Sequence, residues 1–311
     1  MNDEGGELMD SNLLTHLDSL CSPNHRRMLV FGGGKMALAI VEGIVKAGLL
    51  LKENIFISTR TEASSQIWKN LQYRNIFTDN AILCEACWSP DPKFWIVLIA
   101  VKPQTRFTLF EQLRDDMAFD RITRSFADGQ MLVVSVLAGV DVATIRKEYS
   151  EHLFYNGPIL RVCPNVACAI GSGITLVCSD SLTPRKFIDI GIELFQSVGI
   201  VKELPEGQFD AAAAVAGSGP AFIFLVIEAL TDGGVAAGLP RELAIELASN
   251  MVKGSADLVI STGNEPAKLR GDVCSPAGTT ICGIRKLEEG KVRSSFIEAI
   301  ILTAARSKEL R

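Results

Sequence analysis

Arg27-Met-Leu-Val-Phe31 runs directly into Gly32-Gly-Gly-Lys-Met-Ala37, which fits the pattern G-x-G-x-x-A. In dinucleotide-binding proteins this pattern stands where a buried strand turns into a helix. Gly32 permits the tight turn, Gly34 lets the backbone approach a pyrophosphate, and the small Ala37 allows close contact between helix and strand. The helix N-terminus adds N–H donors and the positive end of its dipole. The stretch therefore favours a dinucleotide site over a purely structural glycine turn.

The residues around this stretch predict a doubly wound parallel sheet. Short apolar runs with the composition of buried strands recur at 27–31, 55–58, 94–100, 131–136, 160–162 and 174–178. The gaps between the first four leave room for helices, and alternating strands and helices are typical of α/β proteins with a parallel sheet. We therefore assign residues 27–204 to a Rossmann-like dinucleotide-binding domain and residues 1–26 to a disordered leader.

The chain changes character after Leu204. Residues 205–311 are Ala-rich and helical, and Pro220 and Pro240 each suit the first position of a helix. The stretch 240–260 is apolar around most of its circumference, which is too much for a helix packed on one side. About 100 residues of such helices make a poor independent core. We expect an all-helical dimerisation and substrate domain that buries its excess apolar surface against a second copy.

Composition excludes several classes of protein. Of the 311 residues, 31 are Lys or Arg and 36 are Asp or Glu, so the net charge of -5 offers no attraction to nucleic acid or to an anionic membrane. The apolar run 211–227 approaches the length of a membrane span, but Gly217-Ser-Gly-Pro220 interrupts it, and we interpret it as the start of a buried helix. The acidic N-terminus has neither a long apolar segment nor an Arg-rich pattern, which favours a cytoplasmic protein.

Cysteine and histidine are distributed unfavourably for a metal site, and we expect none. The eight cysteines are scattered among apolar neighbours, which favours buried, reduced thiols, and Cys84-Glu-Ala-Cys87 has no second pair at zinc-finger spacing. Two of the three histidines, His16 and His25, lie in the polar leader, and the third is His152, so a histidine base is not expected. Reduction of a C=N bond fits better, because a protonated imine already carries its proton.

The end of the second expected strand bears on the choice of dinucleotide. Ser58-Thr-Arg-Thr61 offers hydroxyls and one guanidinium in place of the acidic residue typical of NAD sites. This set suits a 2'-phosphate, unless Arg60 is only a solvated loop residue. NADPH is therefore the favoured cofactor and NADH the alternative. Ala100-Val-Lys-Pro103 and Ala138-Gly139 follow strong strands and are expected to form cofactor walls, although Pro103 would also suit a helix start.

Two helix starts in the helical part combine glycine with hydroxyl residues. They are Ala216-Gly-Ser-Gly-Pro220 and Cys274-Ser-Pro-Ala-Gly-Thr-Thr280. At such positions the exposed N–H groups and the helix dipole bind anions such as a carboxylate. Each start alone is better explained as an ordinary N-cap. Together with a redox fold, the two favour a small carboxylate substrate.

Seven stretches resemble pyrroline-5-carboxylate reductases, and they occur in order between about residues 28 and 310. They lie at 32–37, 100–104, 134–139, 161–165, 217–221, 232–240 and 269–281. The run Val273-Cys-Ser-Pro-Ala-Gly-Thr-Thr-Ile281 is the most specific of them. The resemblance implies hydride transfer from NAD(P)H to the C=N carbon of 1-pyrroline-5-carboxylate, giving L-proline in the last step of proline biosynthesis.

The resemblance also assigns residues to the two ligands. It places the cofactor on Gly32, Gly34, Lys35, Met36, Thr59, Arg60, Asn80, Ala100, Lys102, Pro103 and Ala138. It places the substrate on Glu206, Ser218, Asp272, Ser275, Thr279 and Thr280. Backbone N–H groups near Thr279 are expected to hold the carboxylate, and the Thr280 hydroxyl, as the catalytic group, to hydrogen-bond the ring nitrogen. Members of this family dimerise through interlocked helical domains, often as pentamers of dimers, so a homodimer or a decamer is expected.

Several positions depart from the family pattern. Ala213 and Ala216 stand where hydroxyl residues are usual, Gly271 where Asn or Asp is usual, and Gly33 where alanine is usual. Ala277 replaces a glycine and restricts a loop in which glycine would allow a positive φ. These departures leave two alternatives open: an NADP-dependent reductase of another cyclic imine or a hydroxy acid, and a non-catalytic NADP-binding oligomer.

Overall fold

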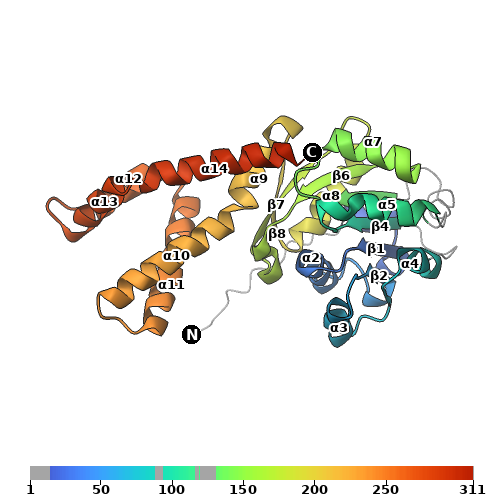
Figure 1. Ribbon diagram of the computed structural model, residues 1–311, viewed down its shortest axis with the longest axis horizontal. Helices are drawn as coiled ribbons and strands as arrows, with labels where there is room; N and C mark the ends of the chain where they lie inside the picture. Colours follow the sequence, from blue (N-terminus) through green and yellow to red (C-terminus); the bar gives the residue numbers. More distant parts are fainter. Residues whose placement is uncertain (1–14, 88–93, 116–118, 120–130, 311) are drawn as a thin grey trace. The chain divides into compact units, whose positions relative to one another are not determined.

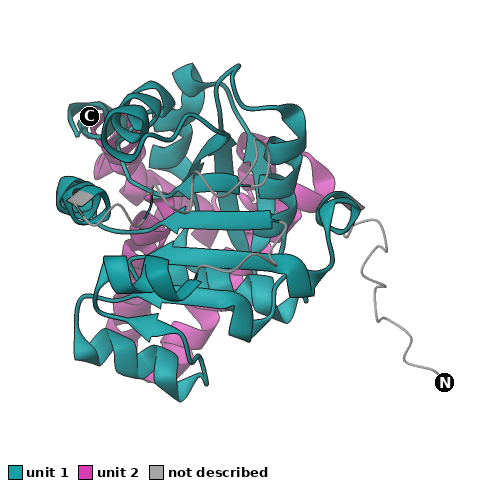
Figure 2. Cartoon of the chain, turned by 90° about the vertical axis from the view of Figure 1, so that its right-hand side faces the viewer, with its two compact units in different colours: residues 1–217, 304–311 teal, residues 218–303 magenta. Residues whose placement is uncertain are grey.

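The computed structural model describes residues 15–87, 94–115, 119 and 131–310 (Figure 1). These residues form two compact units (Figure 2). Unit 1 contains the described residues up to Gly217 together with those from Ala304 onward, and unit 2 is Ser218–Thr303. The chain therefore passes from unit 1 into unit 2 after Gly217 and returns to unit 1 at Ala304.

Unit 1 is built on an eight-stranded sheet with the order β3-β2-β1-β4-β5-β6-β7-β8 (Figure 1). The strands are β1 Arg26–Phe31, β2 Ile55–Ser58, β3 Ile76–Phe77, β4 Phe94–Ile99, β5 Met131–Ser135, β6 Ile159–Cys163, β7 Gly173–Cys178 and β8 Gly199–Glu203. Neighbouring strands pair in parallel, except that β6 and β7 pair antiparallel. The expected doubly wound sheet is confirmed. The apolar pattern did not predict β3 and β8, because these edge strands are only partly buried.

Helices cover both faces of this sheet. They are α2 Lys35–Lys46, α3 Glu62–Asn70, α4 Asn80–Cys87, α5 Arg106–Asp115, α7 Val142–Leu153 and α8 Arg185–Gln196, with 3-10 turns at Lys52–Asn54, Pro103–Thr105 and Val166–Ile170. Successive strand residues point to opposite faces, so β1 contributes Met28 and Val30 to one core and Leu29 and Phe31 to the other. Helices α2, α3 and α8 pack on the first core, and α4, α5 and α7 on the second.

The segment before β1 corrects the expectation of a disordered leader over residues 1–26. Thr15–Leu20 forms helix α1, Pro23–His25 forms a 3-10 turn, and β1 begins at Arg26. Leu17 is fully buried, and its N–H donates to Glu193 Oε2 of α8 at 3.1 Å. Arg26 is also fully buried, donates to the carbonyls of Cys21 and Leu49 at 3.0 Å, and pairs with Asp18. Residues 15–26 are therefore part of the folded unit.

The cysteines are all free thiols, and five of them are buried. Burial raises the pKa of the Cys87 thiol to about 12 and also raises that of Cys84 far above its ordinary value. A thiol held protonated in this way is a poor nucleophile and a poor metal ligand. The expectation of buried, reduced cysteines is confirmed for most of them, with Cys282 exposed.

The C-terminal part of the chain is helical, as expected. The helices are α9 Glu206–Ala216, α10 Gly219–Ala236, α11 Arg241–Thr262, α12 Pro266–Val273, α13 Thr279–Glu289 and α14 Val292–Glu309. Helix α9 belongs to unit 1, because Phe209, Asp210 and Ala214 are buried there. The boundary between the units thus follows Gly217, thirteen residues after the domain boundary expected at Leu204.

Unit 2 leaves large apolar side chains exposed. Phe224 and Leu225 of α10 are 60% and 62% exposed, and the described residues of α10 and α11 include only three buried ones. The stretch Glu206–Ala236 is apolar and long enough to cross a membrane by length and composition alone, and 6% of its most apolar window is buried. The expectation of a buried helix within 211–227 is therefore wrong for the single chain, because α10 finds too few partners in unit 2.

Candidate active site

The glycine loop has the geometry that a dinucleotide requires. Gly32 has a φ of +101°, and a Cβ atom there would lie 2.6 Å from the Ala100 carbonyl oxygen, so the position excludes any side chain. The N–H groups of Gly32 and Gly33 both donate to the carbonyl of Ser58, at 3.2 and 2.8 Å. Gly34 is the N-cap of α2, and no atom lies within 4 Å of the Cβ it lacks. The open side at Gly34 is where a pyrophosphate could approach the helix N-terminus.

Gly33 has a local reason to differ from the usual alanine. A Cβ at this position would lie 2.7 Å from Thr59 Cγ2 and 2.7 Å from Trp68 Nε1. The indole N–H of Trp68 donates to the Gly33 carbonyl at 2.9 Å, and Trp68 is fully buried. The space that alanine would need is therefore filled by the tryptophan of α3.

The four strand ends that carry the expected cofactor residues lie at one edge of the sheet. Phe31, at the end of β1, is in register with Ser58 of β2 and Ile99 of β4, and Ile99 is in register with Ser135 of β5. Gly32–Gly34 and Ala100 follow β1 and β4 directly, and Ala138 lies three residues after the end of β5. The structure thus brings them together where ligands of open α/β sheets bind.

Among the polar candidates, Arg60 and Lys35 are exposed and Thr59 is not. Arg60 has no acidic partner among the described residues, which leaves its guanidinium available to an anion. The Thr59 hydroxyl is 2.5 Å from Ser65 Oγ, and the residue is 2% exposed, so its side chain supports the loop from inside. Met36, next to Lys35 in the first turn of α2, packs against the core.

Asn80 and the segment after β4 are fixed by hydrogen bonds. The Asn80 side chain accepts from Ser58 Oγ at 2.5 Å and donates to Gln112 Oε1 at 2.6 Å. Lys102 is exposed, and Pro103 starts the short 3-10 turn that follows it. Arg106 donates to the Pro103 carbonyl at 3.0 Å. Its Nε and Nη2 atoms also donate to the nearly buried carboxylate of Glu148, with distances of 3.0 to 3.1 Å. This ion pair anchors the Lys102-Pro103 turn to α7.

Glu206 is engaged inside unit 1. Its Oε1 pairs with Arg161 Nη1, and its Oε2 accepts from the Val142 N–H at 3.2 Å and lies 3.5 Å from Cys178 Sγ. Burial, followed by the neighbouring Glu206 charge, raises the pKa of Cys178 to about 12. Arg161 is 2% exposed and also pairs with Asp210 at 2.8 Å. The Glu206 carboxylate thus holds the start of α7 and a buried arginine.

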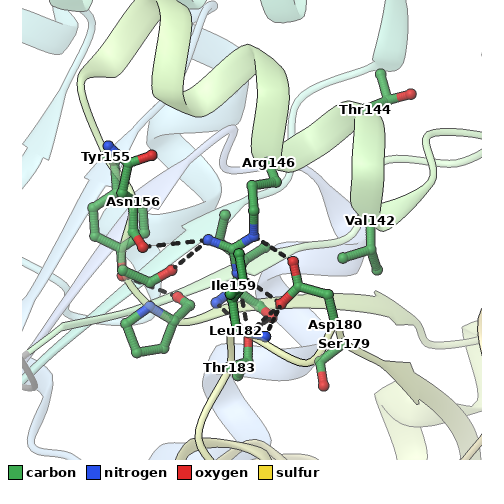
Figure 3. Close-up of polar contacts among 12 residues, drawn as sticks. Val142, Thr144, Arg146, Tyr155, Asn156, Ile159, Ser179, Asp180, Leu182 and Thr183 are labelled. Atoms are coloured by element: carbon green, nitrogen blue, oxygen red, sulfur yellow. Dashed lines mark hydrogen bonds and ion pairs between the residues drawn. The ribbon is translucent and has the colours of Figure 1, made fainter.

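A second arginine network, which the sequence did not suggest, links the second turn of α7 to the residues that follow β7 (Figure 3). Arg146 pairs with Asp180 through two contacts, one of them 2.9 Å, and donates to the Asn156 carbonyl at 3.3 Å. Thr183 Oγ1 links the network to the Ile159 N–H at 3.2 Å. Burial would raise the pKa of Asp180, but the hydrogen bond and charge of Arg146 hold it below its ordinary value. A paired, partly buried arginine of this kind stabilises the scaffold rather than a ligand.

The other expected substrate residues lie in unit 2. Ser275, Thr279 and Thr280 are exposed around the first turn of α13, and Gly278 is its N-cap without a side-chain hydrogen bond. The Gly278 N–H donates to the Ser275 carbonyl at 3.0 Å, which closes a turn in which Ala277 has a φ of +55°. The restriction expected at Ala277 is therefore present as a left-handed backbone.

Asp272 and Ser218 have less specific surroundings. Asp272 makes an exposed pair with Lys268 at 2.7 Å, one turn away on α12. Ser218 is the N-cap of α10 without a side-chain hydrogen bond. The described residues contain no group of three His, Cys, Asp or Glu side chains that could hold a metal.

The glycine loop on a doubly wound sheet, followed by a helical region with unburied apolar faces, defines a dinucleotide-dependent oxidoreductase that associates through its C-terminal helices. Residues 27–139 match the family described as NADP oxidoreductase coenzyme F420-dependent, and residues 206–310 match pyrroline-5-carboxylate reductase dimerisation. The chain belongs to the pyrroline-5-carboxylate reductase family.

Relatives and solved structures are similar over most of the chain. The pyrroline-5-carboxylate reductases of Methanosarcina acetivorans and Arabidopsis thaliana are each 35% identical, over 90% of this chain and over 96% and 93% of theirs. The crystal structure of the Plasmodium falciparum pyrroline carboxylate reductase with NADP bound has a TM-score of 0.75 and 25% identity, covering 93% of this chain and 99% of that one. The Streptococcus pyogenes enzyme has a TM-score of 0.75 and 26% identity, covering 92% and 99%.

Proposed function

We propose that this chain catalyses the NAD(P)H-dependent reduction of 1-pyrroline-5-carboxylate to L-proline, the last step of proline biosynthesis. The observation that carries the proposal is the family membership, with 35% identity over 90% of the chain to reductases of that name. The open glycine loop at Gly34 and the unpaired, exposed Arg60 fit the phosphates of NADPH. NADH remains the alternative cofactor.

In the proposed mechanism the chain binds and orients the two reactants. The N–H groups at the start of α2 hold the pyrophosphate, Arg60 holds the 2'-phosphate, and Ala100 and Ala138 form the walls beside the cofactor. When bound, the reduced nicotinamide supplies a hydride to the C=N carbon. Backbone N–H groups near Thr279 hold the substrate carboxylate, and the Thr280 hydroxyl hydrogen-bonds the ring nitrogen. The protonated imine brings the remaining proton, so no histidine is needed.

One assay distinguishes the proposal from its two alternatives. NADPH oxidation is followed with 1-pyrroline-5-carboxylate and with its six-membered-ring homologue. NADP reduction is followed with a β-hydroxy acid. Turnover highest with the five-membered imine supports the proposal, and a higher kcat/KM for either other substrate overturns it. Tight NADPH binding without turnover would instead identify a non-catalytic oligomer.

Thr280→Val tests the proposed catalytic hydroxyl. The variant should lower kcat/KM for the imine by about tenfold or more, since a hydrogen bond to a developing charge is lost. The affinity for NADPH should be unchanged. Cys282→Ser is the matched control, because Cys282 is exposed and lies two residues after Thr280 on the same helix. It should leave both constants unchanged.

The chain is further proposed to act as a homodimer that assembles up to a decamer. The dimerisation match over 206–310 and the exposed apolar side chains of α10 and α11 support the homodimer, and the decamer is proposed from the resemblance alone. An open apolar cleft of about 540 Å³ among α12, α13 and α14, lined in part by Leu287 and Phe296, adds to the surface that a second copy would cover. Light scattering after size-exclusion chromatography measures the mass directly, and a monomer at micromolar concentration would contradict the proposal.

A cytoplasmic location is also proposed. Its support is the set of eight free cysteines, because unpaired thiols persist in reducing compartments. Cell fractionation with a compartment marker tests it, and recovery with a membrane or organelle fraction would contradict it.

A further inference from the structure

We infer that the C-terminal turn of α14 positions the cofactor loop after β5, with Leu310 and Ser307 as the positioning residues. Gly139, in that loop, has a φ of +75°, and a Cβ atom there would lie 2.6 Å from Leu310 Cβ and 2.9 Å from the Ser307 carbonyl oxygen. The backbone of the loop therefore lies directly against the end of the helix. The inference rests on the proposed cofactor site at Ala138.

The same helical turn is held by a buried ion cluster. Ser307 Oγ donates to Asp210 Oδ1 at 3.0 Å, and Asp210 pairs with Arg161 at 2.8 Å. Asp210 is 3% exposed and Arg161 is 2% exposed, so these contacts are shielded from water. Residues from Ala304 onward accordingly belong to unit 1, although most of α14 belongs to unit 2.

The loop against which Leu310 packs is fixed at both ends. At its start the Val136 N–H donates to the Ile99 carbonyl at 3.0 Å, which ties it to β4. At its end Asp141 caps α7 by accepting from the Thr144 N–H at 2.8 Å, and Glu206 accepts from the Val142 N–H. Between these fixed ends, Gly139 lies against Leu310, and Ala138 is its neighbour in the chain.

The exposed Ala138 lies where the cofactor is proposed to bind, so a shift of this backbone would displace the bound dinucleotide. A displacement of about 1 Å can cost up to ~100-fold in a reaction that depends on alignment. Leu310→Ala keeps the Cβ atom but removes Cδ1, which would lie 3.3 Å from a Cβ atom at Gly139, so the variant opens a gap beside this residue and frees the loop to move.

Leu310→Ala and Ser307→Ala test the inference in the full-length protein, and Arg306→Ala is the matched control. Arg306 lies in the same turn, is exposed, and pairs with Glu309. NADPH affinity is measured by fluorescence titration, and kcat and the imine KM are measured at saturating NADPH. Leu310→Ala should raise the NADPH Kd about fivefold and Ser307→Ala about twofold, with the imine KM unchanged. Leu310→Met, which keeps a large apolar side chain at this position, should have the same NADPH Kd as the parent.

An NADPH Kd within twofold of the parent for Leu310→Ala overturns the inference. An equal rise in the NADPH Kd for Arg306→Ala also overturns the inference, because the effect would then come from general fraying of the helix end. Arg60→Ala, included in parallel, distinguishes a failure of the proposed cofactor site. If Arg60→Ala weakens NADPH binding and Leu310→Ala does not, the site stands and the role of the C-terminal turn falls.

Discussion

Arg161 Nη2 lies 2.8 Å from Asp210 Oδ1, and the two side chains are 2% and 4% exposed. Arg161 extends from β6, and its guanidinium also pairs with Glu206 and lies 4.1 Å from the centre of the Phe209 ring. Both acidic partners and the phenyl ring come from α9, so a single buried arginine holds that helix to the sheet. A buried guanidinium is tolerated only when it is paired in this way.

Arg161→Met should lower the free energy of unfolding by about 3–5 kcal/mol, because the buried Asp210 carboxylate would lose the guanidinium charge that pairs with it. Arg185→Met is the control, since Arg185 is 60% exposed and its pairs with Asp189 and Glu203 are worth less than about 1 kcal/mol. Urea unfolding at equal protein concentration measures both, because association also affects apparent stability. Equal losses would show that the cluster is not a stability determinant.

Arg60→Ala should raise the KM for NADPH by about 10- to 100-fold and change that for NADH less than about twofold. The reason is that a charge-assisted pair with a phosphate is lost only with the phosphorylated cofactor. Lys69→Ala removes an exposed cation of α3 that pairs with Glu62 and should change neither constant. Equal losses for the two cofactors would remove Arg60 from the 2'-phosphate site.

Gly33 and Gly34 are adjacent but should respond differently to alanine. Gly33→Ala places a methyl group 2.7 Å from Trp68 Nε1, so it should lower the free energy of unfolding by about 1–3 kcal/mol through overpacking. Gly34→Ala meets no atom within 4 Å and should leave stability nearly unchanged, but it should weaken NADPH binding about tenfold or more by filling the space for the pyrophosphate. Thermal unfolding and NADPH titration of both variants check the contrast. Similar effects of the two substitutions on both measurements would contradict it.

The sheet and the glycine loop could be predicted because their signals are local. β1 and β4 are buried on both faces, so each appears in the sequence as an apolar run, and the glycine pattern follows β1 directly. Helix α1 could not be predicted in this way, since Leu17 finds its partner Glu193 176 residues along the chain.

The polar scaffold of the candidate site was missed for a similar reason. Arg161 interrupts an apolar strand, which is a visible signal, but its partners Glu206 and Asp210 lie 45 and 49 residues away. The resemblance alone assigns Glu206 to substrate, whereas in the structure its carboxylate pairs with Arg161 and accepts from the Val142 N–H. The exposure of α10 also follows from a partner that a single chain does not contain.

Ala277 and Lys291 each have a φ of +55°, a left-handed backbone conformation that is unfavourable for residues other than glycine. Replacing either with glycine removes a steric cost of about 1–2 kcal/mol and adds disorder to the unfolded chain, so each should stabilise unit 2 by about 0.5–1 kcal/mol. Urea unfolding of the two single variants, side by side with the parent, measures this gain.

The kinetic effects of the two substitutions should differ. Ala277 lies in the turn that precedes Thr279 and Thr280, whereas Lys291 lies between α13 and α14. Because glycine raises the population of the left-handed turn, Ala277→Gly should lower the imine KM by about two- to fivefold. Lys291→Gly should leave the KM unchanged and so serves as a control for stability alone. An unchanged KM for Ala277→Gly, with the same gain in stability, would mean that the turn already holds its binding conformation in the parent.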